Sequence, residues 1–327
     1  MSDPRISSAN TKPAAQKTIR IGTRGSPLAL VQARQIASAL EAVSGGVYHG
    51  EIVTFTTTGD KLTSERLINS GGKGLFTTEI DNALDNGDID IGVHSMKDVP
   101  SILPTGQVLV AIPEREDPRE AFLSPHGKSL SDMPIGARIG TASLRREAQT
   151  LARRKDVKIV TFRGNVATRM RKLEEGLADA TYLAMAGLTR LGVAHLGSAI
   201  PLDEMLPAAA QGIVGVIGRE DMSADLREAL ARITHTNTEA QCTAERAFLA
   251  GLDGSCRTPI AGHLFDKGDH WHMRGEVLAI DGQTVWSAAL DAPREASLKD
   301  LEALGARLAN KIRDAAGGEL PAFEDDH

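Results

Sequence analysis

The stretch that decides the fold is residues 18–40, TIRIGTRGSPLALVQARQIASAL. Residues 18–24 have the composition of a buried strand, and the residues from Ser26 onward have the apolar spacing of a helix. Ser26 is the expected N-cap, and Pro27 stands in the first helical position, where proline is favoured. Because a strand followed at once by a helix is the repeating unit of α/β domains, the stretch predicts an α/β lobe.

The alternation continues along the chain. EIVTFTT at 51–57, LFTTEIDNALDNG at 75–87 and DIDIGVHS at 88–95 predict a strand, a helix and a buried strand, and hence a parallel sheet. Further on, ARIGTASLRREAQTLARR begins a second series of strands and helices. The letters IGT occur at the same strand-to-helix corner in both series, beginning at Ile21 and at Ile139. We therefore expect two α/β lobes of similar plan.

The pattern changes near the C-terminus. IAGHLF, HWHMRGEVLAI and TVWSAAL predict a small antiparallel sheet, and SLKDLEALGARLANKI predicts a closing helix. These elements make a third domain of the α+β class. The predicted bounds are a disordered lead at 1–17, domain 1 at 18–112 and 213–232, domain 2 at 113–212, and domain 3 at 233–327.

Composition limits the class of protein. The 327 residues carry a formal net charge of −6, with a pI near 5.9, and 3% of them are aromatic. Proteins that bind nucleic acid are usually basic, and those that bind single strands rely on aromatic stacking, so we expect no nucleic-acid partner. The two cysteines make no disulfide framework, and no Cys/His spacing typical of zinc occurs, so we expect a reducing compartment and no metal.

No export or membrane segment is expected. Residues 1–17 lack the apolar core of a signal peptide, and no apolar run approaches the roughly 20 residues that cross a bilayer. The sequence therefore predicts a cytoplasmic protein without a membrane partner.

Basic residues gather where predicted strands end and helices begin. Arg24, the pair Arg145 and Arg146, and Arg163 lie at such corners, and Lys97 follows another strand end. Ligands of open α/β sheets bind at these ends, and an anion would offset the penalty of about 0.3 to 1 kcal/mol for arginine in a first helical turn. Phosphate and carboxylate both fit such charges. A solvated helix face explains the same arginines without a ligand, so both interpretations stay open.

Three further features have alternatives. GGKGLF at 71–76 lacks the spacing of a P-loop, which favours a carboxylate ligand over a phosphate and leaves a flexible loop as the simpler interpretation. Asp98 either pairs with a neighbouring arginine or faces a substrate cation. His94 is better explained as a packed strand-end residue than as a base.

The two cysteines differ in their surroundings. Cys242 lies in the helical pattern TEAQCTAERAFLAG, where a small buried side chain is expected. Cys256 lies in GLDGSCRTPI, between glycines and a proline, and beside Arg257, whose charge favours the thiolate. From the residues alone, a nucleophilic role for Cys256 and a role without chemistry both stay open.

Nine short segments occur along nearly the whole chain after residue 17: TRGSPLAL, GGKGLF, VHSMKDVP, EREDPREAF, GTASLRR, RGNVATR, LAMAGLTRLG, AAAQG and GSCRTPI. In this combination and order the sequence resembles the porphobilinogen deaminase (hydroxymethylbilane synthase) family. The resemblance implies two lobes like those of type II periplasmic binding proteins, a small C-terminal domain and a monomer.

The resemblance also implies the chemistry. In this family the cysteine matched by Cys256 carries a dipyrromethane cofactor, made from two porphobilinogen units, through a thioether. Porphobilinogen loses ammonia, and the free α-carbon of the bound chain attacks the resulting methylene-pyrrolenine. Four additions and a hydrolysis release the linear tetrapyrrole hydroxymethylbilane. Asp98 matches the catalytic aspartate, which stabilises positive charge as ammonia leaves, and Lys97 flanks it.

The other matches hold carboxylates or donate hydrogen bonds, because each pyrrole ring carries an acetate and a propionate. The residues expected to bind the cofactor are Cys256, Lys97, Asp98, Thr141, Ser143, Arg145, Arg146, Arg163 and Gln211. The residues expected to bind substrate are Arg24, Ser26, Lys73, Arg169 and Arg190.

The chain departs from the family pattern at two positions. Asn69 stands where many relatives carry a second lysine, and Ser255 replaces a glycine common before the cysteine. The main rival interpretation is a solute-binding or ligand-sensing module with the same two lobes, which would explain an anion site but not Cys256.

Overall fold

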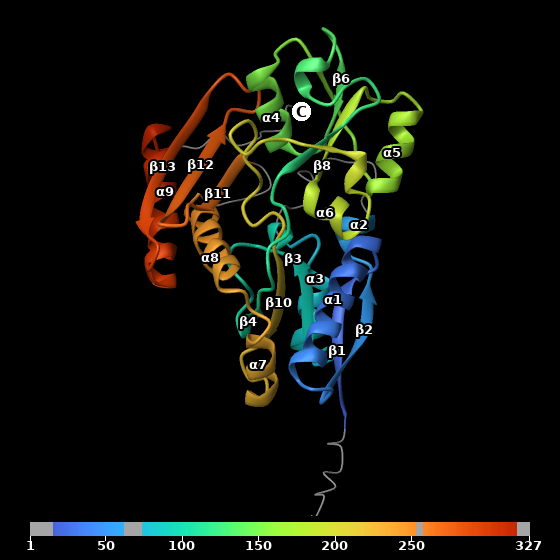
Figure 1. The fold of residues 1–327 in the computed structure, drawn as a ribbon, viewed down its shortest axis with the longest axis vertical. Helices are drawn as coiled ribbons and strands as arrows, with labels where there is room; N and C mark the ends of the chain where they lie inside the picture. Colours follow the sequence, from blue (N-terminus) through green and yellow to red (C-terminus); the bar gives the residue numbers. More distant parts are fainter. Residues whose placement is uncertain (1–15, 62–73, 253–257, 319–327) are drawn as a thin grey trace, which may run out of the picture.

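The computed structural model describes residues 16–61, 74–252 and 258–318, which form two α/β lobes and a smaller third domain (Figure 1). The strands of lobe 1 are β1 (Lys17–Arg24), β2 (Tyr48–Phe55), β3 (Ile91–Ser95), β4 (Gln107–Ala111) and β10 (Val214–Arg219). They form one five-stranded sheet in the order β2-β1-β3-β10-β4. The helices of lobe 1 are α1 (Pro27–Val43), α2 (Thr58–Lys61), α3 (Thr78–Asp85) and α7 (Ala224–Ala231).

Lobe 2 has the same plan. Its strands are β5 (Glu120–Leu123), β6 (Arg138–Gly140), β7 (Lys158–Val160), β8 (Ala180–Ala184) and β9 (Ser198–Ala199). Their order in the sheet is β7-β6-β8-β5-β9. Position by position this matches the order β2-β1-β3-β10-β4 of lobe 1, with β5 in the place of β10. The helices are α4 (Leu144–Arg153), α5 (Val166–Glu174) and α6 (Met185–Arg190). The expectation of two similar α/β lobes is confirmed.

The expected parallel sheet in lobe 1 is wrong for part of that sheet. β1 is parallel to β2 and β3, but β10 is antiparallel to β3 and β4. The reason is the path of the chain, because β10 enters from lobe 2 at Val214, which pairs with Ser95 at the end of β3. β5 enters lobe 2 in the same way, with Glu120 opposite Ala184 at the end of β8. Both inserted strands therefore begin where the chain crosses between the lobes.

α1 begins as the sequence predicts. The Oγ of Ser26 accepts a hydrogen bond from the backbone N–H of Ala29 at 3.3 Å, and Pro27 is the first helical residue. Ile36 and Leu40 on one face of α1 are buried in the core of the lobe. This packing fixes the position of the N-terminus of α1 at the end of β1.

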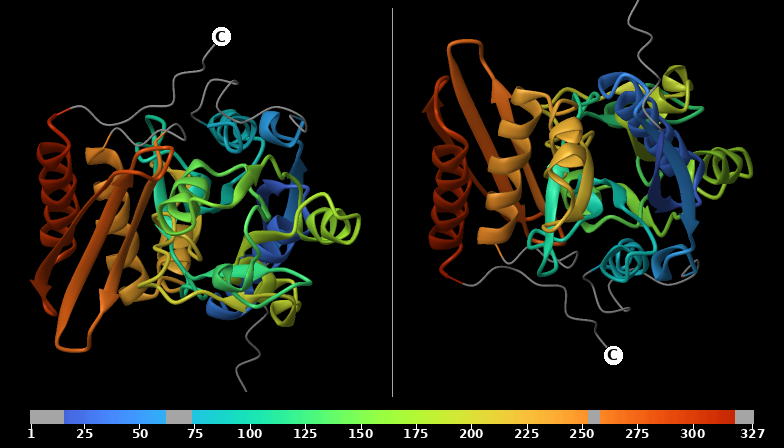
Figure 2. Two further views of the ribbon diagram at one scale, coloured as in Figure 1. Left: turned by 90° about the horizontal axis from the view of Figure 1, so that it is seen from above. Right: turned by 90° about the horizontal axis from the view of Figure 1, so that it is seen from below.

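Domain 3 contains α8 (Thr236–Gly251), β11 (Ile260–Asp266), β12 (His270–Leu278), β13 (Val285–Pro293) and α9 (Leu298–Ala315). The expected antiparallel sheet and closing helix are confirmed. Phe248 of α8 and Leu308 of α9 share one core with Trp271 of β12. The two helices approach closely at Gly305, where a Cβ atom would lie 2.1 Å from the carbonyl oxygen of Ala244. Domain 3 lies on one side of the lobes, with α9 outermost (Figure 2).

Among the described residues, each helix is too short or too polar to cross a membrane.

Candidate active site

A cleft of about 1160 Å³ lies between the two lobes. Leu249, Thr258 and Ile260 of domain 3 form part of its wall. The polar and charged residues singled out from the sequence that line it are Arg24, Ser26, Lys97, Asp98, Ser143, Arg145, Arg146, Arg163, Arg169 and Gln211. Strand-to-helix corners of both lobes therefore meet at one cleft.

Three helix N-termini open onto this cleft. α1, α4 and α5 begin directly after Ser26, Ser143 and Asn165, each of which lines the cleft. The side chains of these residues accept hydrogen bonds from first-turn backbone N–H groups at 3.3, 3.5 and 2.9 Å. The N-terminal ends of the helix dipoles add partial positive charge, so the backbone itself favours an anionic ligand.

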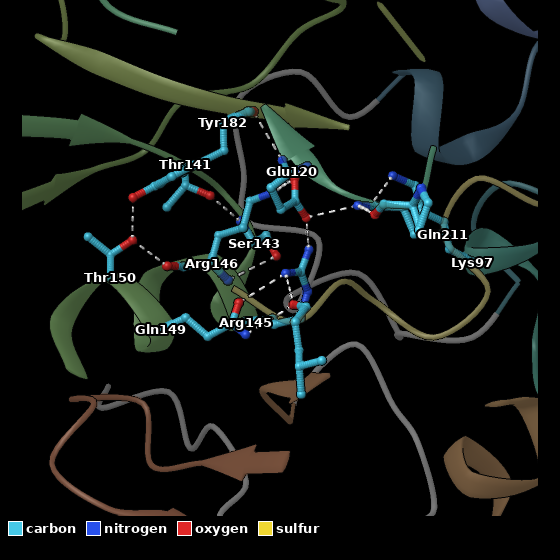
Figure 3. Close-up of polar contacts among 12 residues, drawn as sticks. Lys97, Glu120, Thr141, Ser143, Arg145, Arg146, Gln149, Thr150, Tyr182 and Gln211 are labelled. Atoms are coloured by element: carbon cyan, nitrogen blue, oxygen red, sulfur yellow. Dashed lines mark hydrogen bonds and ion pairs between the residues drawn. The ribbon is translucent and has the colours of Figure 1, made fainter. Parts of the chain in front are cut away.

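Arg145 and Arg146 share one buried carboxylate, that of Glu120 (Figure 3). The Nε and one Nη of Arg146 donate to Oε2 at 3.1 and 2.7 Å, and Arg145 donates to Oε1. The arginine side chains are only 7% and 9% exposed, and the Glu120 side chain is fully buried. The interpretation of these arginines as a solvated helix face is therefore wrong.

The cluster around Glu120 carries excess positive charge. Burial would raise the pKa of Glu120, but the surrounding cations, Arg146 first, lower it to about 2. Gln211 links the carboxylate to a further cation, because its amide donates to Glu120 at 3.1 Å and accepts from the Nζ of Lys97 at 3.1 Å. Burial lowers the pKa of Lys97. The charges of Lys97, Arg145 and Arg146 thus all act on the carboxylate of Glu120.

Arg169 has no carboxylate partner in the part of the chain that the structure describes. Its Nε donates to the carbonyl oxygen of Gly164 at 2.9 Å, and an Nη donates to that of Tyr182 at 3.3 Å. Burial, together with the nearby charge of Arg146, lowers the pKa of Arg169 to about 10. Burial also lowers the pKa of Arg163. A carboxylate ligand would stabilise the charged form of Arg169.

Arg24 and Asp98 both line the cleft, but only Arg24 is paired with a described residue of opposite charge. Arg24 is paired with Asp60, and its guanidinium lies 4.2 Å from the centre of the Phe76 ring. The carboxylate of Asp98 makes no hydrogen bond or ion pair with any described residue. The structural salt bridge considered for Asp98 is therefore absent from residues 16–61, 74–252 and 258–318.

Comparison with known proteins decides the family. The family model described as "Porphobilinogen deaminase, dipyromethane cofactor binding domain" matches residues 19–227, and "Porphobilinogen deaminase, C-terminal domain" matches residues 239–314. This chain belongs to the porphobilinogen deaminase family. The deaminase is 50% identical to "Porphobilinogen deaminase" of Paracoccus denitrificans over 312 residues, which are 94% of this chain and 97% of that protein. It is 51% identical to the chloroplastic protein of that name from Pisum sativum over 275 residues, which are 82% and 74% of the two chains.

The family gives the activity. The deaminase is a hydroxymethylbilane synthase, a transferase of tetrapyrrole biosynthesis that joins four porphobilinogen molecules head to tail, releases ammonia and uses a dipyrromethane cofactor. The rival interpretation as a ligand-sensing module is therefore wrong.

Solved structures that match include TRAP periplasmic solute binding proteins from Desulfovibrio salexigens and Roseobacter denitrificans, with TM-scores of 0.43 and 0.40 and identities of 10% and 12%. The matches cover 71% and 72% of the deaminase and 76% and 85% of those chains.

Some predicted residues of the deaminase do not line the cleft. Thr141 is buried, and its hydroxyl accepts from the N–H of Ser143 at 3.1 Å. An Nη of Arg190 donates to the carbonyl oxygen of Gly212 at 2.8 Å. Thr141 and Arg190 therefore contact the chain near the cleft rather than the cleft itself. The positions that lie outside the described residues are Asn69, Lys73, Ser255, Cys256 and Arg257.

His94 and Cys242 are packed side chains, as the sequence predicts. His94 is 5% exposed, and burial together with the charge of Arg24 lowers its pKa to about 4. Cys242 is 1% exposed, and burial raises its pKa to about 12. Both side chains are therefore held in their neutral forms inside the core.

The sequence reasoning missed Glu120, Asp60 and Phe76. Glu120 begins the buried strand β5, which reads EAFL and is otherwise apolar. A carboxylate at the start of such a run has to be paired if it is buried, and this was the available signal. Asp60 and Phe76 lie far from Arg24 along the chain, and no local pattern connects them with it.

Proposed function

We propose that the cleft holds the dipyrromethane cofactor and the growing pyrrole chain, with Asp98 as the catalytic residue. One observation carries this proposal. Lys97 and Arg169 form no hydrogen bond or ion pair with a carboxylate among the described residues, and they share one cleft with Asp98, whose carboxylate forms none with a cation there.

The residues present fit the cofactor. Each pyrrole ring carries an acetate and a propionate, and the cleft offers buried guanidinium and ammonium groups beside three helix N-termini. The proposed cofactor residues in the cleft are Lys97, Asp98, Ser143, Arg145, Arg146, Arg163 and Gln211. The proposed substrate residues there are Arg24, Ser26 and Arg169. When bound, the cofactor supplies the free α-carbon to which the first porphobilinogen is joined.

Thr141 and Arg190 support the site through neighbours. The hydroxyl of Thr141 fixes the backbone of Ser143, and Arg190 fixes Gly212, the residue after Gln211. We therefore assign both as positioning residues, in place of the direct ligand contacts that the sequence resemblance implied.

Asp98 acts by charge. Its carboxylate accepts hydrogen bonds from substrate pyrrole N–H groups and stabilises the positive charge that develops as ammonia leaves, which is electrostatic catalysis. The ammonium of Lys97, the preceding residue, flanks Asp98 and holds a cofactor carboxylate. Since the side chain of Asp98 is not tied to another residue in the described ranges, its charge is available to the ligand.

We assign cofactor attachment to Cys256. Leu249 and Thr258, on either side of it along the chain, both line the cleft. Lys73 is kept as a further substrate residue, because Gly74, which follows it, also lines the cleft.

The proposal also includes the bounds given above for domains 1, 2 and 3, a monomeric state and a cytoplasmic location. It includes no nucleic-acid or membrane partner. The net charge of −6 and the three separate sheets support it.

The test is Asp98→Asn, which keeps the size of the side chain and removes its charge. We expect turnover to fall by about a hundredfold or more while the urea midpoint stays the same. Asp156→Asn is the control, because Asp156 pairs with Arg154 at 2.7 Å on the surface, and its turnover should match the wild type. Unfolding of Asp98→Asn, or turnover equal to that of the control, would contradict the proposal.

A further inference from the structure

The sheet of domain 3 has one face that its helices do not cover. Along β12, the buried residues Trp271 and Met273 pack into the core with α8 and α9, so the alternate residues His270 and His272 point to the opposite face. Asp291 of β13 pairs with His272 in the register of the sheet and is exposed. Leu202 and Asp203 of lobe 2 line a hollow on this face together with the two histidines.

His270, His272 and Asp291 bring three metal-ligating atoms together. One ligand atom from each residue lies within 4.8 Å of the others. The Nδ1 of His272 is 2.6 Å from Oδ1 of Asp291, and the Nε2 of His270 is 4.0 Å from the same oxygen. Ligand atoms around a tetrahedral zinc ion, with bonds of about 2.0 to 2.1 Å, lie roughly 3.3 Å apart. An ion would replace the hydrogen bond between His272 and Asp291, whose atoms would move apart, while His270 and Asp291 would move closer.

A second carboxylate prepares His270 for this role. The Nδ1 of His270 lies 2.6 Å from Oδ1 of Asp269. A carboxylate at that nitrogen holds the proton there and leaves Nε2, the atom that faces Asp291, with its free lone pair. The ring of Phe265 packs against that of His272, with centroids 6.0 Å apart, and restricts its rotation. This is the arrangement in which metal-binding histidines are usually held.

The charges around the cluster are mixed. A shallow hollow of about 390 Å³ at this place is lined by Asp203, Lys267 and Arg274 as well as by the two histidines. Lys267 and Arg274 lie over the ring of Phe265, at 5.1 and 6.0 Å from its centre. The two cations weaken the attraction for a metal ion, and the three acids Asp203, Asp269 and Asp291 offset them.

We propose that His270, His272 and Asp291 form a binding site for a divalent transition-metal ion of the zinc class. Two imidazoles and one carboxylate are the donors that such ions prefer, and they leave a coordination position open to water or another ligand. The ion bridges β12 and β13 on the face of the sheet opposite α8 and α9. The site does not use the residues of the cleft, so this proposal is independent of the proposed function.

The experiment is a calorimetric titration of the full-length holoenzyme with Zn²⁺ after removal of bound metal by a chelator. We expect saturable binding at one site that is lost in His272→Ala. Asp269→Asn keeps all three ligands, and the loss of the carboxylate behind His270 should weaken binding by about 10–100-fold. His49→Ala is the control, because His49 also stands beside an acid on the surface, Glu41, at 3.9 Å, without a third ligand.

A second readout reports the ligands directly. The visible spectrum of the Co²⁺-loaded protein should change when His270 is replaced by alanine and should stay the same in the His49→Ala control. Turnover should be unchanged in all these variants, because none of the residues lines the cleft. The proposal is overturned if the wild type shows no saturable zinc binding, or if His272→Ala and Asp269→Asn bind zinc as the wild type does.

Discussion

Glu120→Gln tests the idea that one buried carboxylate holds the arginine pair of the cleft in place. The change keeps the shape of the side chain and removes the charge that Arg145 and Arg146 share. The pKa of Glu120 is lowered from 4.5 to about 2, and at roughly 1.4 kcal/mol for each pH unit this corresponds to about 3 kcal/mol of stability at neutral pH. Breaking a buried ion pair from one side typically costs a similar 3–5 kcal/mol or so. We therefore expect the free energy of unfolding to fall by about 3 kcal/mol.

The assay is urea unfolding followed by circular dichroism, with Glu175→Gln as the matched control. Glu175 pairs with Arg171 at 2.7 Å at the exposed C-terminal end of α5 in the same lobe, and its loss should cost no more than about 0.5 kcal/mol. Because the folded-state pKa of Glu120 is depressed, its contribution is complete above about pH 4.5 and is lost as the pH falls toward 2. The difference in the free energy of unfolding between the wild type and Glu120→Gln should therefore decrease from pH 4.5 toward pH 2. The reasoning would be refuted if Glu120→Gln lost no more free energy of unfolding than Glu175→Gln, or if its loss did not change below pH 4.5.

Three further predictions concern the cofactor, the ligand carboxylates and the backbone. Cys256→Ser should fold but show no covalent dipyrromethane in its intact mass and no turnover, because an alcohol is a poorer nucleophile than a thiolate, whereas Cys242→Ser should keep both. Arg169→Leu should weaken porphobilinogen binding about tenfold or more in steady-state kinetics, while Arg190→Leu, which loses a backbone contact outside the cleft, should lower the urea midpoint with a smaller change in KM. Ala210 has a φ of +59°, so Ala210→Gly should leave the free energy of unfolding unchanged or raise it by up to about 1 kcal/mol. A fall in the free energy of unfolding of more than about 1 kcal/mol would contradict this prediction.

The elements of the lobes could be predicted because their signals are local. Ser26 and Pro27 mark the start of α1 in sequence and in structure alike. The direction of β10 could not be predicted in this way, because it depends on where the chain re-enters lobe 1 after crossing to lobe 2. The letters VGVIGR identify a buried strand but contain nothing that distinguishes a parallel from an antiparallel neighbour.

The sequence predicted residues that line the cleft, but it did not predict which residues they contact. The basic corners do meet at one cleft, because the carboxyl ends of neighbouring parallel strands lie at one edge of a sheet. The pairing of Arg145 with Glu120 spans 25 positions and joins two elements of lobe 2, so no spacing rule contains it. Arg190 looked equivalent to the other arginines in sequence, but its position at the end of a short helix directs it to the carbonyl oxygen of Gly212.

The buried pairing changes how variants of the cleft must be interpreted. Replacing Arg145 or Arg146 removes a ligand-facing cation, but it also leaves Glu120 with less compensation in a fully buried position. Loss of the cofactor in such a variant would follow from a disturbed lobe as readily as from a lost carboxylate contact. Arg169 bonds only to backbone carbonyl oxygens in the described part of the chain, so its removal leaves no buried acid behind. Arg169 is therefore the arginine whose substitution reports on ligand binding, and Glu120 is the residue whose substitution reports on the scaffold.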